Sequence, residues 1–354
     1  MRRGVNAISY LSKVSGLMLL MVAFVCLAGC RHQQAEYVRV EGSMLGTFLH
    51  LSAQTSVSSA EIYERMMRID SMAKASMSIF DKNSLLSRIN RGETDSLDEH
   101  IVFNITLAER VSRLSGGVYD VTVKPLVEAY GFAGKNPDFK VNVDSLLEFV
   151  GYDKISVRDG RLVKSDRRVQ LDFNSIAKGY VVDLAAEALE QWGIENYMVD
   201  IGGEVRCKGV NPKGMAWRVG IETPFDGNDV PGAYIQQVLS LNDCAMATSG
   251  NYRRYYIDNQ GRKVAHTINP QTGQSAITDL LSATVVAPTC AEADAFGTMF
   301  MALGKERAIE LARELESEGV MVYFITSGEG DEFEIYYSKQ LASALKQIEG
   351  FNAI

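Results

Sequence analysis

The segment Leu171–Leu189, LDFNSIAKGYVVDLAAEAL, constrains the fold more than any other part of the chain. An apolar run ends at Asp172 and apolar residues then recur at helical spacing, which predicts a strand that passes directly into a helix. Asn174 and Ser175 are residue types that often cap a helix, so we expect the helix to begin there. The junction would bring a carboxylate, a hydroxyl and the ammonium group of Lys178 together. A helix N-terminus can bind phosphate, although an ordinary helix start with a solvated lysine has the same pattern.

The order of the predicted elements favours an α+β fold. Strands and helices mix along the chain without a regular βαβ repeat, which argues against a doubly wound parallel sheet. The order of strand, polar loop and helix occurs twice, in residues 169–189 and 281–303, and is compatible with a diverged internal duplication. The chain has no GxGxxG or GxxxxGK[ST] motif, so a Rossmann or P-loop site is excluded. It has no GxSxG motif either, so nothing indicates a nucleophile elbow.

The net charge narrows the class of partner. The 354 residues carry a formal charge of −8 and contain no cluster of lysine and arginine. A nucleic-acid-binding protein normally presents a basic surface, so we expect no nucleic-acid partner. An acidic protein that handles phosphates needs local lysines, backbone N–H groups or a metal ion to offset their charge.

The N-terminus reads as a processing signal. Basic residues precede an apolar run from Leu17 to Ala28, and LAGC at 27–30 resembles a bacterial lipobox. We therefore expect residues 1–29 to be a lipoprotein signal peptide, residues 30–37 to hold a lipidated Cys30 and a tether, and residues 38–354 to form the functional domain. The lipid would fix the protein to the membrane of the bacterial envelope, on the periplasmic side. A plain signal peptide or an N-terminal anchor helix is the alternative.

The three cysteines beyond the lipobox are widely spaced. Cys207, Cys244 and Cys290 form no CxxC pair and no pattern with histidine that indicates zinc. We expect buried thiols and no disulfide framework.

Several other residues are candidates for chemistry. Asp294 and Thr298 are four residues apart, so they share one face of a predicted helix, and their oxygens suit Mg²⁺; a helix cap and a core threonine are the alternative. His266 precedes a turn-rich loop, where function concentrates, although a lone histidine is more often structural. Met44 and Phe80 could contact a flat ring or could equally pack in the core.

Eight segments, taken in order, resemble the ApbE family of FAD:protein FMN transferases of the bacterial envelope. Residues 174 and 175 are Asn-Ser where many members have Gly-Gly. The matching segments are GSMLGT (42–47), SIF (78–80), YDVTVKPLVEAYGF (119–132), LDFNSIAKGYVVD (171–183), VDIGGEV (199–205), TSGNY (248–252), HTINPQTG (266–273) and ATVVAPTCAEADAFGTMF (283–300).

The resemblance implies a two-lobed ApbE-like fold of sheets and helices, with FAD in a groove between the lobes. It also implies a set of site residues. The positions that match FAD contacts are Met44, Phe80, Val118, Tyr119, Asp120, Asp172, Lys178 and Ile268, and those that match Mg²⁺ ligands are Ser175, Asp294 and Thr298.

The family transfers the FMN half of FAD to a threonine or serine hydroxyl of a target protein and releases AMP. Its targets are redox subunits and flavin carriers of the envelope. On this basis we expect Asp294 to act in catalysis through Mg²⁺, and Lys178 to neutralise a phosphate or to position the adenylate side of FAD. We expect His266 to accept the proton of the target hydroxyl, given the near-neutral pKa of an ordinary histidine.

Two other functions compete with transfer. The same site could hydrolyse FAD to FMN and AMP with Mg²⁺ if water replaced the acceptor hydroxyl. A periplasmic FAD-binding lipoprotein without turnover is the second alternative, and the metal-binding positions argue against it because storage of FAD requires no metal on its pyrophosphate. A non-catalytic envelope scaffold fits the sequence least.

Overall fold

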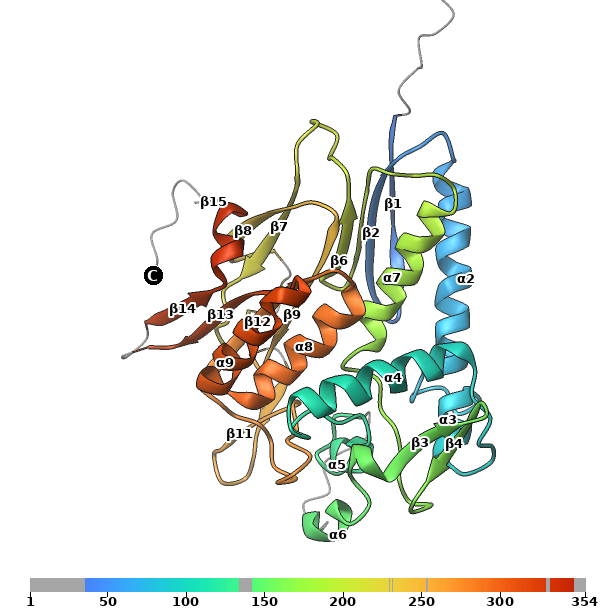
Figure 1. Cartoon of the computed structure of the whole chain (residues 1–354). Coiled ribbons are helices and arrows are strands. Elements are labelled where there is room, and N and C mark those ends of the chain that lie inside the picture. The colour runs from blue at the N-terminus through green and yellow to red at the C-terminus, as the bar shows by residue number, and fades with distance from the viewer. Residues whose placement is uncertain are drawn as a thin grey trace, which may run out of the picture. The chain divides into compact units, whose positions relative to one another are not determined.

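Eight antiparallel strands form the main sheet, in the order β1-β2-β5-β6-β9-β12-β13-β14 (Figure 1). The computed structural model describes residues 36–133, 142–228, 230, 232–252, 254–328 and 332–346, and every structural statement below concerns these residues. Strands from both halves of the chain are neighbours in this sheet. They are β1 (Tyr37–Met44), β2 (Thr47–Gln54), β5 (Tyr197–Ile201), β6 (Glu204–Lys208), β9 (Cys244–Gly250), β12 (Leu280–Ala287), β13 (Met321–Ser327) and β14 (Phe333–Tyr337).

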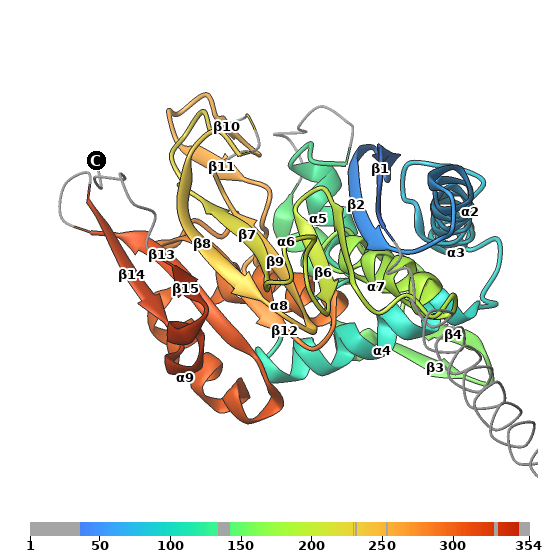
Figure 2. The same ribbon diagram turned by 90° about the horizontal axis from the view of Figure 1, so that it is seen from above.

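Most of the described helices pack on one face of the main sheet and form the large core with it, whereas the short helices at 124–129 and 143–147 form a small core of their own (Figures 1 and 2). Three short 3₁₀ turns accompany them. The helices are α2 (Ser59–Met77), α3 (Leu85–Asn90), α4 (Glu99–Leu114), α5 (Lys124–Ala129), α6 (Val143–Leu147), α7 (Ala177–Glu190), α8 (Cys290–Leu303) and α9 (Lys305–Leu315), and the turns are η1 (Tyr152–Lys154), η2 (Glu316–Glu318) and η3 (Lys339–Ser343).

A small three-stranded sheet packs on the other face of the main sheet. Side chains alternate between the faces of a strand, so neighbours in one strand enter different cores. In β12, Val285 belongs to the core with the helices and Val286 to the core with the small sheet, where Trp217 and Leu239 pack. The strands of the small sheet are β7 (Trp217–Glu222), β8 (Ile235–Leu241) and β15 (Leu345–Lys346).

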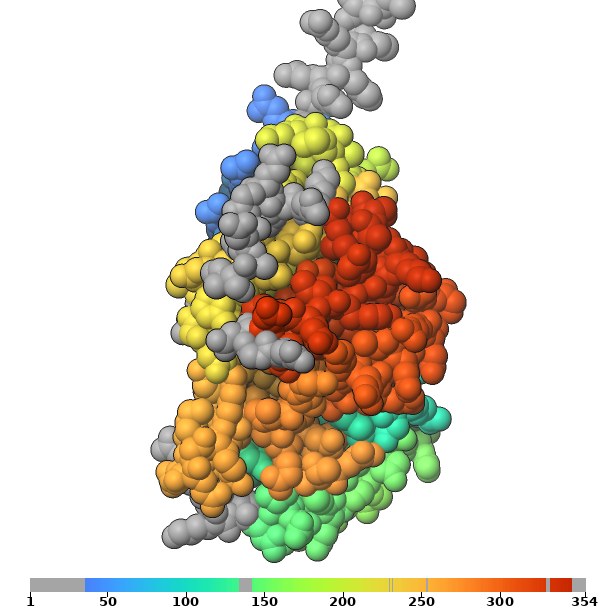
Figure 3. Space-filling model, turned by 90° about the vertical axis from the view of Figure 1, so that its left-hand side faces the viewer, coloured from blue at the N-terminus to red at the C-terminus, as the bar shows by residue number. Residues whose placement is uncertain are grey.

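Two hairpins complete the structure. They are β3 (Ile155–Arg158) with β4 (Arg161–Lys164), and β10 (Tyr255–Ile257) with β11 (Lys263–Ala265). The segment that carries β10 and β11, orange in Figure 3, lies beside the green segment that contains α6. The hydroxyl of Tyr130 donates to the carbonyl oxygen of Gly273 at 3.0 Å and ties the two regions together.

Helices α7 and α8 touch so closely that only glycine fits at the contact. A Cβ atom on Gly179 would lie 2.2 Å from the carbonyl oxygen of Cys290, which is far inside any allowed separation. Small residues let two helix backbones approach in this way. The crossing therefore brings the first turn of α7 next to the first turns of α8.

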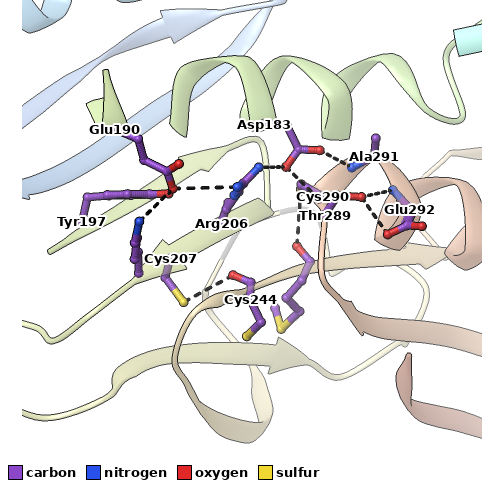
Figure 4. Close-up of polar contacts among 12 residues, drawn as sticks. Asp183, Glu190, Tyr197, Arg206, Cys207, Cys244, Thr289, Cys290, Ala291 and Glu292 are labelled. Carbon is purple, nitrogen blue, oxygen red and sulfur yellow. Dashed lines mark hydrogen bonds and ion pairs between the residues drawn. The ribbon is translucent and has the colours of Figure 1, made fainter. Parts of the chain in front are cut away.

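A network of side chains caps the beginning of α8 (Figure 4). The Asp183 carboxylate, from α7, accepts hydrogen bonds from the N–H groups of Cys290 at 2.9 Å and Ala291 at 2.8 Å. Arg206 of β6 donates to the same carboxylate at 2.8 Å. The hydroxyl oxygen of Thr289 accepts from the N–H of Glu292, which completes the cap. These contacts fix the beginning of α8, and with it the positions of the side chains that α8 carries.

The predicted α+β class is confirmed, and the main sheet is continuous across both halves of the chain. The internal duplication and the placement of FAD between two lobes stay predictions. The structure describes no residue before 36, so the predicted signal peptide, the lipidation of Cys30 and nearly all of the tether lie outside the described residues. Among the helices that are described, none is long and apolar enough to cross a membrane.

The junction that begins at Leu171 differs from its prediction in two ways. Gln170 forms only an isolated bridge to Val123, so the segment before the helix is extended but does not belong to a sheet. Helix α7 begins at Ala177 after Ile176, with no side-chain cap, so the predicted cap at Asn174 or Ser175 is wrong. Both residues instead belong to the turn that precedes the helix.

The prediction for the cysteines is confirmed in part. Cys207, Cys244 and Cys290 are all free thiols. Cys207 and Cys290 are buried, whereas Cys244 is half-buried.

Candidate active site

A cavity of about 300 Å³ lies where the beginning of α7, one face of α8 and the loop before α5 meet the chain on either side of the β10–β11 hairpin. Nearly all of the predicted site residues line it, although they come from distant parts of the sequence. Those that line it are Val118, Tyr119, Asp120, Asp172, Ser175, Lys178, His266, Ile268, Asp294 and Thr298.

Met44 and Phe80 do not line this cavity. Met44 ends β1 and is fully buried in the core between the sheet and the helices. Phe80 lies in the turn after α2 and is 65% exposed. Their contact with FAD stays a prediction, and the cavity in this structure does not extend to them.

The loop before α5 contributes a tyrosine and a carboxylate. The hydroxyl of Ser175 donates to the phenolic oxygen of Tyr119 at 2.9 Å, which holds the turn before α7 against this loop. Asp120 is buried and accepts from the N–H of Thr122 at 2.7 Å. Burial raises the pKa of Asp120 to about 6, because the ionised carboxylate loses its hydration.

Asp172 occupies the turn that leads into α7. Its side chain accepts from the N–H of Asn174 at 2.8 Å, while its own N–H donates to the carbonyl oxygen of Val121 at 2.8 Å. Both bonds position the carboxylate at the cavity wall. Burial raises the pKa of Asp172 above its usual range.

Lys178, Glu204 and Asp294 form the charged centre of the cavity. The ammonium group of Lys178 lies 2.5 Å from a carboxylate oxygen of Glu204, and the other oxygen of Glu204 is buried without a hydrogen-bond partner in the described residues. Burial raises the pKa of Glu204 to about 7 despite the nearby lysine. Burial alone would lower the pKa of Lys178, but the charges of Glu204 and Asp294 outweigh it and raise that pKa.

Asp294 joins the two helices at the cavity. Its Oδ2 accepts from the N–H of Gly179, in the first turn of α7, at 3.0 Å. Asp294 is buried, and burial raises the pKa of its carboxyl group. Thr298 lies one turn further along α8 and faces the same cavity, so the predicted common face of the pair is confirmed.

His266 lines the cavity next to the β10–β11 hairpin. Its ring contacts Phe132 edge-on, with 6.3 Å between the centroids, and its Nδ1 is buried without a hydrogen-bond partner in the described part of the chain. Burial, together with the charge of Arg254, lowers the pKa of His266 to about 4. The expectation of a near-neutral pKa is therefore wrong for the free protein, in which the ring is neutral at pH 7.

Sequence reasoning missed several residues of the cavity. Glu204 directly follows the Gly202-Gly203 turn within a segment that matched the family, and that position could have singled it out. Arg254 follows the TSGNY segment but carries no local signal of its own. The further lining residues that were missed include Thr248, Ser249, Gly250, Tyr252 and Thr267.

The oxygen donors fit a magnesium ion that binds together with a phosphate. No three His, Cys, Asp or Glu side chains within the described ranges are grouped so that they could hold a metal by themselves. Mg²⁺ often takes only one or two carboxylates from the protein and completes its shell with water and substrate phosphates. The carboxylate of Asp294 and the hydroxyls of Ser175 and Thr298 match this pattern, and the unpartnered oxygen of Glu204 lies in the same cavity.

The cavity as a whole can bind a ligand that carries phosphates and can remove a proton from it or its reaction partner. Lys178 and the oxygen donors for a metal come from α7, the turn before it and α8, whereas the neutral His266 and the cationic Arg254 come from the two ends of the β10–β11 hairpin. Apolar side chains such as Val123, Val127 and Ile268 line the remaining wall. Transfer or hydrolysis of a phosphate ester fits this combination of groups.

Comparison with known proteins identifies relatives along nearly the whole chain. The model of the ApbE family matches residues 45–324. The FAD:protein FMN transferase of Haemophilus influenzae is 35% identical over 328 residues, which cover 88% of this chain and 92% of the relative. The protein of the same name from Escherichia coli strain K12 is 32% identical, with coverage of 92% and 96%.

Solved structures show the same similarity. The flavin transferase ApbE from Vibrio cholerae superposes with a TM-score of 0.76 at 30% identity and covers 88% of this chain and 99% of its own. The apo form of the flavinyl transferase ApbE from Pseudomonas stutzeri gives a TM-score of 0.77 at 26% identity, with coverage of 88% and 97%. The predicted resemblance is confirmed, and the chain belongs to the ApbE family.

Proposed function

We propose that this chain is an FAD:protein FMN transferase that moves FMN from FAD to a threonine or serine hydroxyl of a target protein and releases AMP. The observation that carries the proposal is the single cavity that joins Lys178, Asp294, Thr298 and His266. The shared name of the relatives supports the choice of FAD and of a protein acceptor.

The reaction is a phosphoryl transfer. The acceptor oxygen forms a bond to the phosphorus of the FMN half, and the bond from that phosphorus to the bridging oxygen of the pyrophosphate breaks. AMP leaves with the bridging oxygen, and the acceptor hydroxyl loses its proton to a base. Little covalent chemistry falls to the protein, so binding, orientation and neutralisation of charge supply most of the rate.

The residues of the chain divide this work. The ammonium group of Lys178 faces the phosphates, and the neutral ring of His266 accepts the proton of the hydroxyl. Asp294, Thr298 and Ser175 would hold Mg²⁺, which neutralises charge on the pyrophosphate when it is bound. Ser175 keeps this position through its hydrogen bond to Tyr119.

The decisive experiment incubates the protein with FAD, Mg²⁺ and a candidate acceptor domain and reads covalent flavin by mass spectrometry. We expect the acceptor to gain the mass of FMN less one water, in an amount equal to the AMP released. Release of AMP at the same rate without an acceptor would contradict transfer and would show FAD hydrolysis instead. Bound FAD without any product would show a storage protein.

We also propose that Cys30 carries the lipid that holds the protein at the periplasmic face of the membrane, next to membrane-bound redox acceptors. The LAGC segment supports this position. Membrane fractions of cells that express the full chain should contain the mature protein with acylated Cys30, and the Cys30→Ser variant should lose both the acyl chain and membrane retention. A Cys30→Ser variant that stays in the membrane fraction would show an anchor helix instead.

A further inference from the structure

Two of the described residues that line the cavity carry a positive charge, and their surroundings differ. Lys178 is paired with Glu204 and feels the charge of Asp294. Arg254 is exposed and forms no ion pair with any described residue. The only hydrogen bond that its side chain makes to a described residue runs from Nη2 to the carbonyl oxygen of Phe132, over a long 3.4 Å. The guanidinium group of Arg254 is therefore the positive charge that remains available to a ligand.

Arg254 and His266 are direct neighbours at the end of the β10–β11 hairpin. The N–H of His266 donates to the carbonyl oxygen of Arg254 at 3.1 Å and extends the ladder past the pair Tyr255 and Ala265. Both side chains line the same cavity. The charge of Arg254 is the second cause, after burial, of the low pKa of His266, and the charge of Lys178 has a smaller effect in the same direction.

The other ionisable groups of the cavity make a free arginine more significant. Four carboxyl groups line the cavity, and they are those of Asp120, Asp172, Glu204 and Asp294. They oppose the entry of an anion wherever they are ionised. A guanidinium group presents its N–H donors as a planar fork that matches two oxygens of a phosphate, which an ammonium group cannot do.

We propose that Arg254 binds a phosphate of the FAD pyrophosphate next to His266, and that this phosphate, by offsetting the charge of Arg254, enables His266 to accept the proton of the acceptor hydroxyl. The inference rests on the proposed function and assigns a role in it to a residue outside the predicted site. In the free protein the positive charge disfavours a second one on the ring of His266. Once the phosphate is bound, that repulsion is offset, so the base gains strength only when the substrate is present.

The first test measures binding without an acceptor, so it does not depend on turnover. Equilibrium dialysis with FAD and with riboflavin compares the wild-type protein with Arg254→Gln, Arg254→Lys and the control Arg262→Gln. Arg262 is exposed, is paired with Asp258 and does not line the cavity. We expect Arg254→Gln to weaken FAD binding about 10- to 100-fold, the range for a hydrogen bond to a charged group. Arg254→Lys should fall in between, and Arg262→Gln should bind as the wild type does.

Riboflavin, which lacks phosphate, separates charge recognition from contact with the flavin ring. Its affinity should be the same for the wild type and Arg254→Gln. Equal losses of riboflavin and FAD affinity would place Arg254 against the ring, and unchanged FAD affinity would exclude a phosphate contact. Either result overturns the proposal.

The second test uses the pH profile of FMN transfer. The acid limb of kcat/KM reports the pKa of the base in the free enzyme, and that of kcat reports it in the complex. In the wild type the acid limb of kcat should lie at higher pH than that of kcat/KM, because the bound phosphate offsets the charge of Arg254, and removal of that charge in Arg254→Gln should move the acid limb of kcat/KM to higher pH. Identical kcat/KM profiles would overturn the link to His266. A wild type that binds FAD but transfers no FMN would overturn the proposed function alone, and the dialysis would still decide the phosphate contact.

Discussion

Helices α7 and α8 each carry a buried aspartate that contacts the first turn of the other helix, and the two aspartates are used differently. Asp183 of α7 accepts hydrogen bonds from Cys290 and Ala291, and Arg206 neutralises it (Figure 4). Asp294 of α8 accepts one hydrogen bond from the described residues, from the N–H of Gly179. Both residues are 4% exposed, so burial does not distinguish them.

The difference lies in how much bonding capacity each carboxylate has left. An ionised carboxylate has two oxygens that can accept about four hydrogen bonds. Asp183 uses both oxygens within the fold, whereas Asp294 uses one and lines the cavity. The number of hydrogen bonds that each carboxylate accepts within the fold therefore separates the two acids. Asp183 has a structural role, and Asp294 is free to act in the chemistry of the cavity.

Replacement of Asp294 should have the largest effect on activity. Asp294→Ala should lower kcat for FMN transfer about a thousandfold, or about 4 kcal/mol, because the metal loses its carboxylate. Flavin incorporation into an acceptor, followed by in-gel fluorescence, measures it. Asp294→Asn keeps the bond to Gly179 and should fold like the wild type. Undiminished transfer by the asparagine variant at saturating Mg²⁺ would remove Asp294 from the metal site.

Replacement of Asp183 should affect stability instead. Asp183→Ala leaves the N–H groups of Cys290 and Ala291 without their acceptor. It also leaves the half-buried Arg206 with only the more distant Glu190 as an acidic partner among the described residues, so the free energy of unfolding should fall by about 3 kcal/mol. Urea denaturation measures this loss, and the exposed Glu187→Ala on the same helix is the control. The folded fraction should retain kcat. A loss of kcat as large as that of Asp294→Ala would end the distinction between the two acids.

Asp120 extends the comparison to an acid that has no cation at hydrogen-bond distance among the residues that the structure describes. Its folded-state pKa of about 6 lies above the ordinary 3.8, so the folded protein binds more protons between these values. The unfolding free energy should therefore fall as pH rises from about 4 to about 6, by up to about 3 kcal/mol. The unfolding free energy of the wild type and of Asp120→Asn is measured in urea at several pH values. The difference between the two proteins isolates the contribution of Asp120 to the pH dependence. Parallel curves for the two proteins would contradict it.

A methyl group on Gly179 should have the smallest of these effects. The Gly179→Ala variant would force the backbones of α7 and α8 apart, so the unfolding free energy should fall by about 1–3 kcal/mol. The N–H of residue 179 would also move away from Asp294, so KM for FAD should rise. Unchanged stability, in a thermal melt beside Glu187→Ala, would show that the helices can separate freely.

The sequence predicted which residues line the cavity better than it predicted the contacts that hold them in place. Helical spacing located α7, and the spacing of Asp294 and Thr298 placed both on one face of α8. The family resemblance supplied most of the remaining lining residues. Local pattern was sufficient for these because each signal lies within one segment.

The contacts between segments could not be predicted from local pattern. The cap at Asn174 or Ser175 failed because Phe173, Ile176 and the distant Asp294 satisfy the backbone groups there. Arg254 and Glu204 were overlooked because a charged residue in a loop or at a strand end usually faces water. The low pKa of His266 arises from burial and from the charge of Arg254. The sequence around the histidine indicates neither of them.

The hydrogen bond between Gly179 and Asp294 also determines when, during synthesis of the chain, the cavity can form. Its partners are 115 residues apart, so a ribosome that has made α7 still needs roughly ten seconds to reach Asp294. Until then the nascent chain contains the side of the cavity that α7 forms and lacks the side that α8 forms. The proposed site for FAD is therefore complete only after Asp294 has been made, and a nascent chain that ends before it lacks one wall of the cavity.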